Sequence, residues 1–331
     1  MHPQTVVLVT GASRFVGGEL AVRLAADSTI GRVLAVDTVP PRQELSRRMG
    51  RVEFVRADLS NPQTVKVIFT AKVDTVVHAS MSDSIGTMQL LAACQKSTTV
   101  TQLVVKSTGA VYGVGASDQA VFTERDEPKE IPASGYAKDA MKSESCIRRF
   151  ARRREDVDVT VLRFTNIIGP RSDTALGRYF SLPVVPTVLG YDPRVQLVHE
   201  QDALAVLERA TRERLPGVVN VGGDGVLLLS QAIRRAGRTR LPLPEPAVTT
   251  LGWLLRSSQL VDYSPEQARF RNFGPVLDTT RLRTEFGFVP RWTTAQAFDD
   301  YVGGRALRPT IDPKWIDTAQ RCLLEFAQRL R

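Results

Sequence analysis

The chain has 331 residues, of which 43% are hydrophobic and 24% are charged, so we expect a globular protein with one large domain and a smaller lobe. No apolar run approaches the roughly 20 residues of a membrane-spanning helix, and the opening residues lack the pattern of a secretory signal. The sequence therefore predicts neither a transmembrane segment nor export.

The formal net charge is +9, and 36 of the 44 basic residues are arginines spread along the chain. The densest basic runs, at 148–154 and 234–240, fall where we expect helices to end, and a cation is favourable at a helix C-terminus. Phe150 is the only aromatic residue within them, whereas nucleic-acid surfaces interleave aromatic and basic side chains. We therefore expect no nucleic acid as partner. An anionic cofactor and substrate suit the positive charge.

The three cysteines, Cys94, Cys146 and Cys322, are far apart and form no C-x-x-C pair. This usage is typical of a reducing compartment, so we expect a cytoplasmic protein without a disulfide framework. The three histidines are also scattered along the chain, and no metal site is expected.

The first predicted unit, residues 5–37, has the order strand, glycine turn, helix, strand. An apolar run at 6–9 is typical of a strand buried on both faces, and a second run at 33–36 ends at Asp37. Gly11 ends the first run and Gly17 opens the helix, about 20 residues before Asp37, the spacing at which a carboxylate reaches the ribose of a dinucleotide. These residues predict a dinucleotide-binding βαβ unit with the pyrophosphate at the helix N-terminus. A βα turn that binds no nucleotide is the alternative.

Arg14 departs from the glycine pattern of such loops. The middle glycine normally lets the backbone approach the phosphates closely, and here an arginine occupies that position. Two outcomes are open: Arg14 displaces the cofactor, or its guanidinium forms an ion pair with the pyrophosphate.

Strands alternating with helices follow Asp37. After a basic loop at 40–51 we expect strands at 52–55, 74–79, 102–106 and 157–162, with helices at 86–96 and at about 136–153. This alternation predicts an α/β fold with a doubly wound parallel sheet. Asp58 follows a strand end, where it either reaches an adenine amino group or caps the next helix.

From residue 169 the pattern becomes irregular and richer in proline, which indicates a second lobe. We expect a dinucleotide-binding domain over 1–168, to which residues 195–212 return, and a C-terminal substrate lobe over 169–194 and 213–331. Residues 218–221 are predicted as a short strand and 312–331 as a terminal helix. The apolar stretch 251–260 is interpreted as lobe packing rather than as an interface or membrane-surface helix.

Several short motifs occur in a fixed order along the chain. They are TGASRFVGG at 10–18, VVHAS at 76–80, STGAVYG at 107–113, FTE at 122–124, LRFTNIIGP at 162–170, HEQDA at 199–203, NVGG at 220–223 and DTTRL at 278–282. With Asp37, Asp58 and Tyr136, this succession resembles the extended short-chain dehydrogenase/reductases of the NAD-dependent epimerase/dehydratase family, such as UDP-glucose 4-epimerase. The resemblance implies a Rossmann fold and hydride transfer between a nicotinamide and a carbon of a nucleotide-activated sugar.

The resemblance also implies roles for individual residues. Tyr136 would exchange a proton with the sugar hydroxyl, and Thr108 would hydrogen-bond the same oxygen; the alternative for Tyr136 is an aromatic that only packs. We expect NAD as cofactor, with NADP as the alternative, because Asp37 would repel a 2′-phosphate while Arg14 and Arg42 oppose it. The candidate cofactor-binding residues are Gly11, Ser13, Arg14, Phe15, Val16, Gly17, Asp37, Asp58, Leu59, His78, Ala79 and Ser80.

One element of the family's chemistry is missing. The family places a lysine four residues after the tyrosine, where it holds the nicotinamide ribose and lowers the tyrosine pKa. Here that position is Ala140, and Lys138 and Lys142 fall on nearly the opposite helix face. An unassisted tyrosine has a pKa of about 10, so only about one in a thousand is ionised near pH 7. Two functions stay open: an attenuated epimerase, dehydratase or oxidoreductase, and a dinucleotide-binding sensor or scaffold.

Assembly follows from the same resemblance. In relatives the helices corresponding to 86–96 and 136–153 pair across a two-fold axis, and here they carry apolar residues that include Met88, Leu91, Met141 and Phe150. We therefore expect a homodimer. The link between Ser80 and residue 86 is shorter than in relatives, so the resemblance does not identify the sugar.

Overall fold

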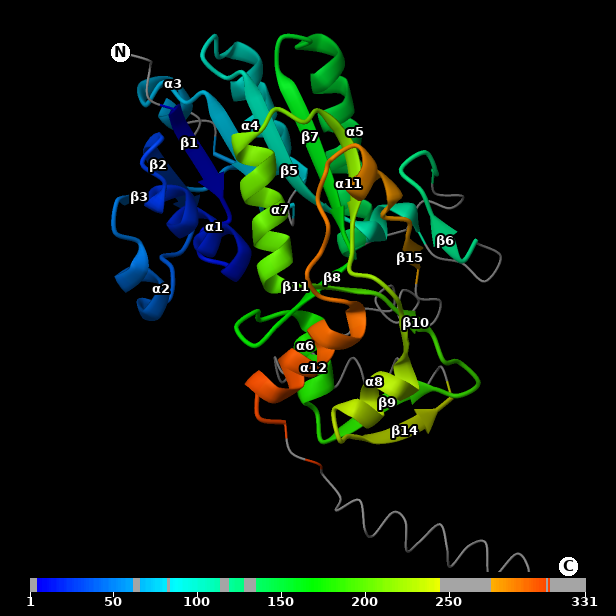
Figure 1. Ribbon diagram of the computed structural model, residues 1–331. Helices are drawn as coiled ribbons and strands as arrows, with labels where there is room; N and C mark the ends of the chain where they lie inside the picture. The colour runs from blue at the N-terminus through cyan, green and yellow to red at the C-terminus, as the bar shows by residue number, and fades with distance from the viewer. Residues whose placement is uncertain are drawn as a thin grey trace, which may run out of the picture.

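The computed structural model describes residues 5–61, 66–81, 84–113, 119–127, 135–244, 275–307 and 309. A seven-stranded parallel sheet forms the centre of the large domain (Figure 1). From one edge to the other its strands are β12 (Gly217–Val221), β7 (Asp158–Phe164), β5 (Gln102–Thr108), β4 (Thr75–His78), β1 (Thr5–Thr10), β2 (Ile30–Asp37) and β3 (Val52–Arg56). The chain order reverses between β1 and β4, the switch point at which such sheets bind ligands. The predicted doubly wound Rossmann fold is confirmed.

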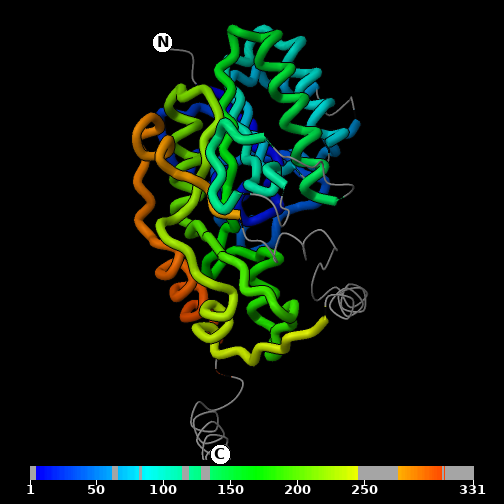
Figure 2. Tube along the Cα trace, turned by 90° about the vertical axis from the view of Figure 1, so that its right-hand side faces the viewer, coloured from blue at the N-terminus to red at the C-terminus, as the bar shows by residue number. Residues whose placement is uncertain are grey.

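Helices cover both faces of this sheet. One layer, with its own apolar core, contains α1 (Phe15–Ala26), α7 (Glu200–Arg212) and α11 (Thr280–Thr284). The opposite layer contains α3 (Lys66–Thr70), α4 (Ser84–Lys96) and α5 (Gly135–Arg153). Figure 2 shows α7 and α11 on one side of the molecule and α4 and α5 on the other.

The apolar run in β1 follows from this two-sided burial. Val7 and Val9 pack into the core beneath α1 and α7, whereas Leu8 packs beneath α4. Successive side chains of a strand leave opposite faces, so a strand covered on both faces needs apolar residues at every position. Each fully buried side chain of this size contributes roughly 1.5–3 kcal/mol.

The second lobe lies below the carboxyl ends of the strands in Figure 1. Its elements are α6 (Ala175–Ser181), β9 (Val184–Val188), β10 (Arg194–Val195), β13 (Leu227–Leu228), α8 (Leu229–Arg235), β14 (Thr239–Leu243) and α12 (Thr294–Gly304). Its apolar core includes Tyr179, Phe180, Phe298 and Tyr301. The Phe180 and Phe298 rings meet edge-on with centroids 4.9 Å apart, which ties α6 to α12.

Two further strand pairs and a short helix join the parts. β8 (Asn166–Ile168) pairs with β11 (Leu197–His199), and β6 (Val121–Phe122) pairs with β15 (Val276–Leu277). The 3₁₀ helix η1 (Gly109–Tyr112) follows β5 directly. Residues 197–212 thus leave the lobe and return to the large domain as α7, as predicted for that helix.

The structure corrects two predictions. Residues 40–51 are not only a loop, because they contain α2 (Gln43–Arg48), whose Leu45 packs against the α1 layer. Residues 217–221 form β12 of the main sheet, and Leu282 of α11 packs into the large domain's core, so 213–331 is not wholly a substrate lobe. The remaining domain boundaries stay a proposal. The predictions for 251–260 and 312–331 lie outside the described residues.

Candidate functional site

The glycine loop joins β1 to α1 at the switch point. Gly11 has a φ of +73°, and a Cβ there would lie 2.8 Å from the Cβ of Ser80. A Cβ at Gly17 would overlap the Gly11 carbonyl oxygen, so both positions require glycine. Arg14, by contrast, has an extended backbone with φ −89° and ψ 156°, which any residue adopts. The loop therefore keeps glycine at the first and last positions of the motif, where its backbone path requires it. At the middle position it carries the Arg14 side chain.

The helix α1 begins at Phe15 directly after this loop. The backbone N–H groups of the first helical turn have no intrahelical acceptors, and together with the helix dipole they attract anions. Phe15, Val16 and Gly17 belong to this turn, as the prediction of a pyrophosphate site requires.

Asp37 is fixed by the loop rather than left to rotate. Its Oδ2 accepts hydrogen bonds from the Ser13 backbone N–H at 2.9 Å and from the Ser13 hydroxyl at 2.5 Å. Its Oδ1 accepts from the Thr38 N–H at 2.7 Å. The structure thus brings Ser13 and Asp37 together at the carboxyl end of β2, with the carboxylate held in one orientation.

A hollow of about 170 Å³ opens between the glycine loop and the ends of β2, β3 and β4. Seven of the predicted cofactor residues line it, namely Gly11, Arg14, Asp37, Asp58, Leu59, His78 and Ser80. Asp58 also accepts hydrogen bonds from the N–H and the hydroxyl of Ser60, at 2.9 and 2.8 Å. Ala79 is buried at the end of β4. These residues are spread over 70 positions of the sequence, and the fold brings them together at the carboxyl ends of the central strands.

The buried His78 ring lines this hollow, and both of its nitrogens have polar partners. Its Nδ1 lies 2.8 Å from the Thr10 hydroxyl and its Nε2 lies 2.9 Å from the Thr87 hydroxyl. Burial lowers the His78 pKa to about 4, so the ring is neutral at physiological pH. Its role is to join β1, β4 and α4 behind the site.

The predicted catalytic pair is assembled. Thr108 ends β5, and Tyr136 lies in the first turn of α5, where its hydroxyl hydrogen-bonds the Thr108 side chain. The residue as a whole remains 42% exposed. Burial raises the Tyr136 pKa, and the Arg14 charge and the Thr108 hydrogen bond oppose that rise.

The position of the missing lysine faces away from solvent. Ala140 is 0% exposed and packs in the apolar core between α5 and the sheet. A cation nevertheless occurs on β5: Lys106 is half-buried two residues before Thr108. Burial, with a smaller contribution from the charge of Arg14, lowers the Lys106 pKa to about 8. The sequence motifs gave no sign of this residue.

A buried polar network lies behind the catalytic pair. Glu144 of α5 forms an ion pair with Arg163 of β7 at 2.6 Å and accepts a hydrogen bond from Ser107. Arg163 also donates to the Tyr112 hydroxyl at 2.9 Å, which donates to Asn220 of β12 at 2.7 Å. Burial alone would lower the Arg163 pKa, but the hydrogen bonds and charge of Glu144 raise it. This network fixes the middle of α5 against the ends of β5 and β7.

A larger cavity of about 780 Å³ also borders the glycine loop. Ser13, Arg14 and Phe15 line it together with α2 and the second lobe. Its lining includes six arginines, Arg14, Arg42, Arg48, Arg171, Arg178 and Arg305. Glu19 pairs with Arg48 and Arg171, and Asp173 pairs with Arg42 and Arg178.

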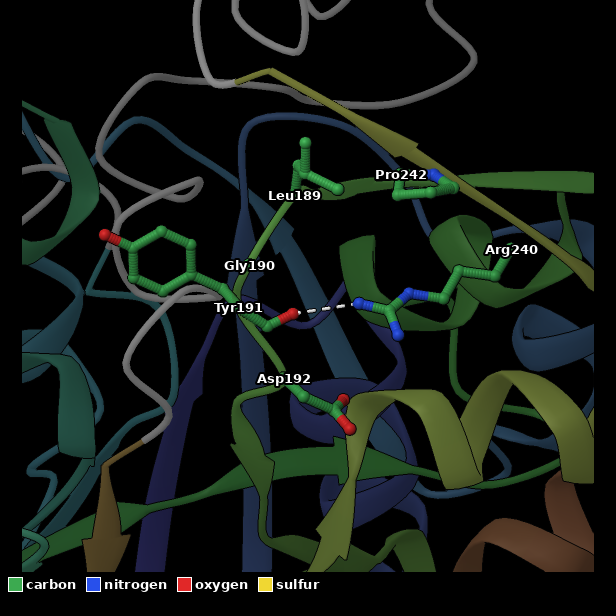
Figure 3. Close-up of a pocket in the computed structure, with 6 residues that line it drawn as sticks. All are labelled: Leu189, Gly190, Tyr191, Asp192, Arg240 and Pro242. Atoms are coloured by element: carbon green, nitrogen blue, oxygen red, sulfur yellow. Dashed lines mark hydrogen bonds between the residues drawn. The ribbon is translucent and has the colours of Figure 1, made fainter.

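The second lobe has a separate open hollow of about 600 Å³ (Figure 3). Leu189, Gly190, Tyr191 and Asp192 line one side, and Arg240 and Pro242 of β14 line the other. Arg240 donates a hydrogen bond to the Tyr191 carbonyl oxygen at 3.0 Å (Figure 3). It shares no lining residue with the two cavities at the glycine loop.

Neither a metal-binding cluster nor a helix fit to span a membrane occurs among the described residues. Within them no three histidine, cysteine or acidic side chains are grouped as a metal would need. Across the same part of the chain, every helix is too short or too polar to cross a bilayer.

Comparison with known proteins decides the family. Residues 7–222 match the NAD dependent epimerase/dehydratase family. The chain belongs to this family. A Mycobacterium tuberculosis protein, described only as uncharacterized, is 47% identical over 345 residues, covering 99% of this chain and 92% of that protein. UDP-arabinose 4-epimerase 1 of Arabidopsis thaliana is 32% identical over 193 residues, covering 52% of this chain and 45% of that enzyme.

Solved structures share the fold. UDP-glucuronic acid 4-epimerase from Bacillus cereus in complex with NAD has a TM-score of 0.67 at 19% identity, covering 90% of this chain and 99% of that one. UDP-glucose 4-epimerase from Thermotoga maritima with UDP-glucose has a TM-score of 0.69 at 18% identity, covering 91% and 98%. The predicted family is confirmed, and with it NAD as the family's cofactor.

Proposed function

We propose that this member of the family is an NAD-dependent epimerase, dehydratase or oxidoreductase that acts on a nucleotide-activated sugar. The observation that carries the proposal is the hydrogen-bonded pair Thr108 and Tyr136, beside a dinucleotide loop at the switch point of the sheet. The names of relatives support the substrate class, because they include UDP-arabinose and UDP-glucuronic acid 4-epimerases.

The residues present fit a dinucleotide. Gly11 and Gly17 keep the loop close to the sheet, and the first turn of α1 offers its N–H groups to a pyrophosphate. Asp37 points both carboxylate oxygens into a fixed network at the end of β2, where a ribose can add hydrogen bonds. NAD, when bound, supplies the hydride acceptor and donor. A cytoplasmic location, argued from the scattered cysteines, is part of the same proposal.

Tyr136 and Thr108 would together carry out the proton transfer. Tyr136 as phenolate accepts the proton of a sugar hydroxyl, and Thr108 holds the same oxygen in line by a hydrogen bond. Because burial raises the Tyr136 pKa, the phenolate is scarce at neutral pH, and the rate should rise as the pH increases.

A second function is favoured by one observation, the buried Ala140 at the family's lysine position. Without that lysine, a protein that binds the dinucleotide and performs no hydride transfer is the alternative. Such a protein would act as a redox sensor or scaffold.

One experiment separates the two functions. The purified protein, loaded with NAD, is incubated with UDP-glucose, UDP-glucuronic acid and a UDP-pentose, and sugar products are followed by NMR. We expect slow conversion of at least one sugar and a loss of 10²-fold or more in Tyr136→Phe, a typical contribution of an acid–base group. Calorimetry should show unchanged NAD affinity in that variant. Tight NAD binding without conversion of any sugar would instead support the sensor or scaffold.

A further inference from the structure

The larger cavity beside the glycine loop concentrates positive charge that the proposed function does not use. Six arginines line it, against only three acidic residues, Glu19, Glu44 and Asp173. This excess of three positive charges is a third of the chain's formal net charge of +9. Neither Thr108 nor Tyr136 lines the cavity, so the catalytic pair does not account for its charge. We call this cavity the arginine cleft.

The walls of the arginine cleft are fixed by contacts between the large domain and the chain that enters the lobe. Arg48 of α2 and Arg171, which follows β8, both pair with the carboxylate of Glu19 on α1. Glu19 is buried, so its charge needs these partners. Glu200 of α7 accepts hydrogen bonds from the backbone N–H groups of Arg171 and Ser172, at 3.1 and 2.7 Å. The cleft therefore has defined walls without a ligand.

Four arginines of the cleft remain after this pairing. Arg42 and Arg178 both pair with Asp173, with the charged atoms 3.2 and 2.7 Å apart. Among the described residues, neither Arg14 nor Arg305 forms an ion pair with a carboxylate. All four side chains are at least partly exposed. The cleft thus presents accessible guanidinium groups whose charge the described part of the chain balances only in part.

Phosphate groups match these arginines in geometry and in charge. A guanidinium presents its N–H donors as a planar fork that fits two oxygens of one phosphate. Each phosphate monoester carries about 1.5 to 2 negative charges at neutral pH, so two such groups balance the excess of three. The first turn of α1, which begins at Phe15, also borders the cleft and favours an anion. The cavity volume is in the range of small-molecule sites, about 300–1,000 Å³.

We propose that the arginine cleft is a second ligand site, which binds a small molecule carrying two phosphate groups. It is distinct from the dinucleotide hollow, with which it shares only Arg14 among its arginines. Two anions beside one guanidinium repel each other, so each ligand should weaken the binding of the other without excluding it. The inference goes beyond the proposed function, because it needs neither the catalytic pair nor turnover.

The test titrates inorganic pyrophosphate into the NAD-saturated protein by calorimetry. We expect one site, and binding at least tenfold weaker in the double variant Arg178→Gln/Arg305→Gln. Neither arginine lines the dinucleotide hollow, and Asp173 keeps Arg42 as its partner, so no carboxylate of the cleft loses its last ion pair. ADP and fructose 1,6-bisphosphate, titrated in the same way, distinguish a ligand with adjacent phosphates from one with separated phosphates. The natural class is the one that binds more tightly and loses affinity in the variant.

The matched control is the double variant Arg32→Gln/Arg235→Gln. It removes the same total charge, but from exposed ion pairs that line none of the three cavities described. Its affinity for pyrophosphate should stay within about twofold of the unmodified protein, because the Debye length is about 8 Å at physiological salt. Both double variants should bind NAD as the unmodified protein does, which also shows that they are folded.

Three results would overturn the proposal. The first is that pyrophosphate does not bind, and the second is equal weakening in the two double variants, which would mean non-specific attraction to a basic chain. The third is complete displacement of pyrophosphate by excess NAD or UDP-glucose, which would place it in the cofactor or sugar site. A failure of the protein to convert any sugar would refute the enzyme and leave this site intact.

Discussion

At the residue scale, we predict that Asp37 sets the choice between the two dinucleotides. Its carboxylate is held by Ser13 and Thr38, so it cannot turn away from a 2′-phosphate at the adenosine ribose. Repulsion between like charges should then disfavour NADP. We predict tighter binding of NAD and a tenfold or greater loss of that preference in Asp37→Asn, about 1.4 kcal/mol.

Calorimetric titration of both dinucleotides measures this preference. Asp192→Asn serves as control, because Asp192 hydrogen-bonds Ser230 in the lobe hollow and does not line either cavity at the glycine loop. Tighter binding of NADP by the unmodified protein would mean that Arg14 and Arg42 outweigh Asp37.

The buried His78 leads to a second prediction, which concerns the stability of the fold at acidic pH. The unfolded chain protonates this histidine near pH 6.5, whereas burial holds its folded pKa at about 4. Its contribution is therefore complete above pH 6.5 and is lost as the pH falls toward 4. Between pH 6.5 and 5 the loss should be about 2 kcal/mol.

Urea unfolding at several pH values tests the His78 prediction through its slope. His78→Gln keeps partners for Thr10 and Thr87 but cannot titrate, so its free energy of unfolding should fall less steeply over this range. Parallel curves for the two proteins would show that His78 is not the group responsible.

At the element scale, the ion pair between Glu144 and Arg163 holds α5 to β7. Both side chains are buried, and Arg163 also supports Tyr112. Removing one partner leaves a buried charge unpaired, so we predict that Arg163→Met lowers the free energy of unfolding by about 3–5 kcal/mol. The double variant with Glu144→Leu should recover part of this loss, because it leaves no isolated charge.

The pair between Arg32 and Glu53 provides the comparison. Its geometry is as good, with 2.7 Å between the charged atoms, but both side chains are about half exposed. Arg32→Met should therefore cost at most about 1 kcal/mol. Denaturant unfolding of the variants measures both values, and equal losses at the two pairs would contradict the argument from burial.

Most elements of the sheet could be predicted because two-sided burial leaves a local signal. The apolar runs located β1, β2, β5 and β7, although β5 and β7 each continue two residues beyond the predicted ends. α2 was not predicted because its six residues have no buried face, apart from the partly covered Leu45. β12 was found as a strand but not as part of the main sheet, since its partner β7 lies more than 50 residues earlier.

The candidate site likewise has a part that the sequence predicts and a part that it does not. The glycine loop, Asp37, Thr108 and Tyr136 follow from motifs, because their spacing along the chain is itself the signal. Lys106 and the Glu144–Arg163 pair could not be predicted, because their significance depends on the strand register and on which helix covers the strand. From the sequence alone, a lysine in a predicted strand indicates an edge strand or a solvent-facing position. Only the register shows that Lys106 lies one residue beyond the end of the neighbouring strand β4.

At the scale of the whole molecule, the helical layer formed by α4 and α5 exposes large apolar side chains among the described residues. α4 and α5 pack side by side on the sheet (Figure 2). α4 exposes Ile85 at 55% and Met88 at 46%. Met141 and Cys146 of α5 are only partly buried. The opposite layer is covered further by α11.

We predict that this α4–α5 layer forms the interface of a homodimer. Two copies related by a two-fold axis would cover Ile85 and Met88 with the same surface of the partner, which is the usual closed arrangement. Light scattering at micromolar concentration should then give twice the chain mass of 36.5 kDa. Met88→Lys should shift the protein to the monomer, because it would place a charge in the apolar centre of the interface. Val289→Lys, which changes an exposed apolar residue next to the opposite layer, should leave the dimer intact. A monomer in the unmodified protein, or dissociation by both substitutions alike, would rule out this interface.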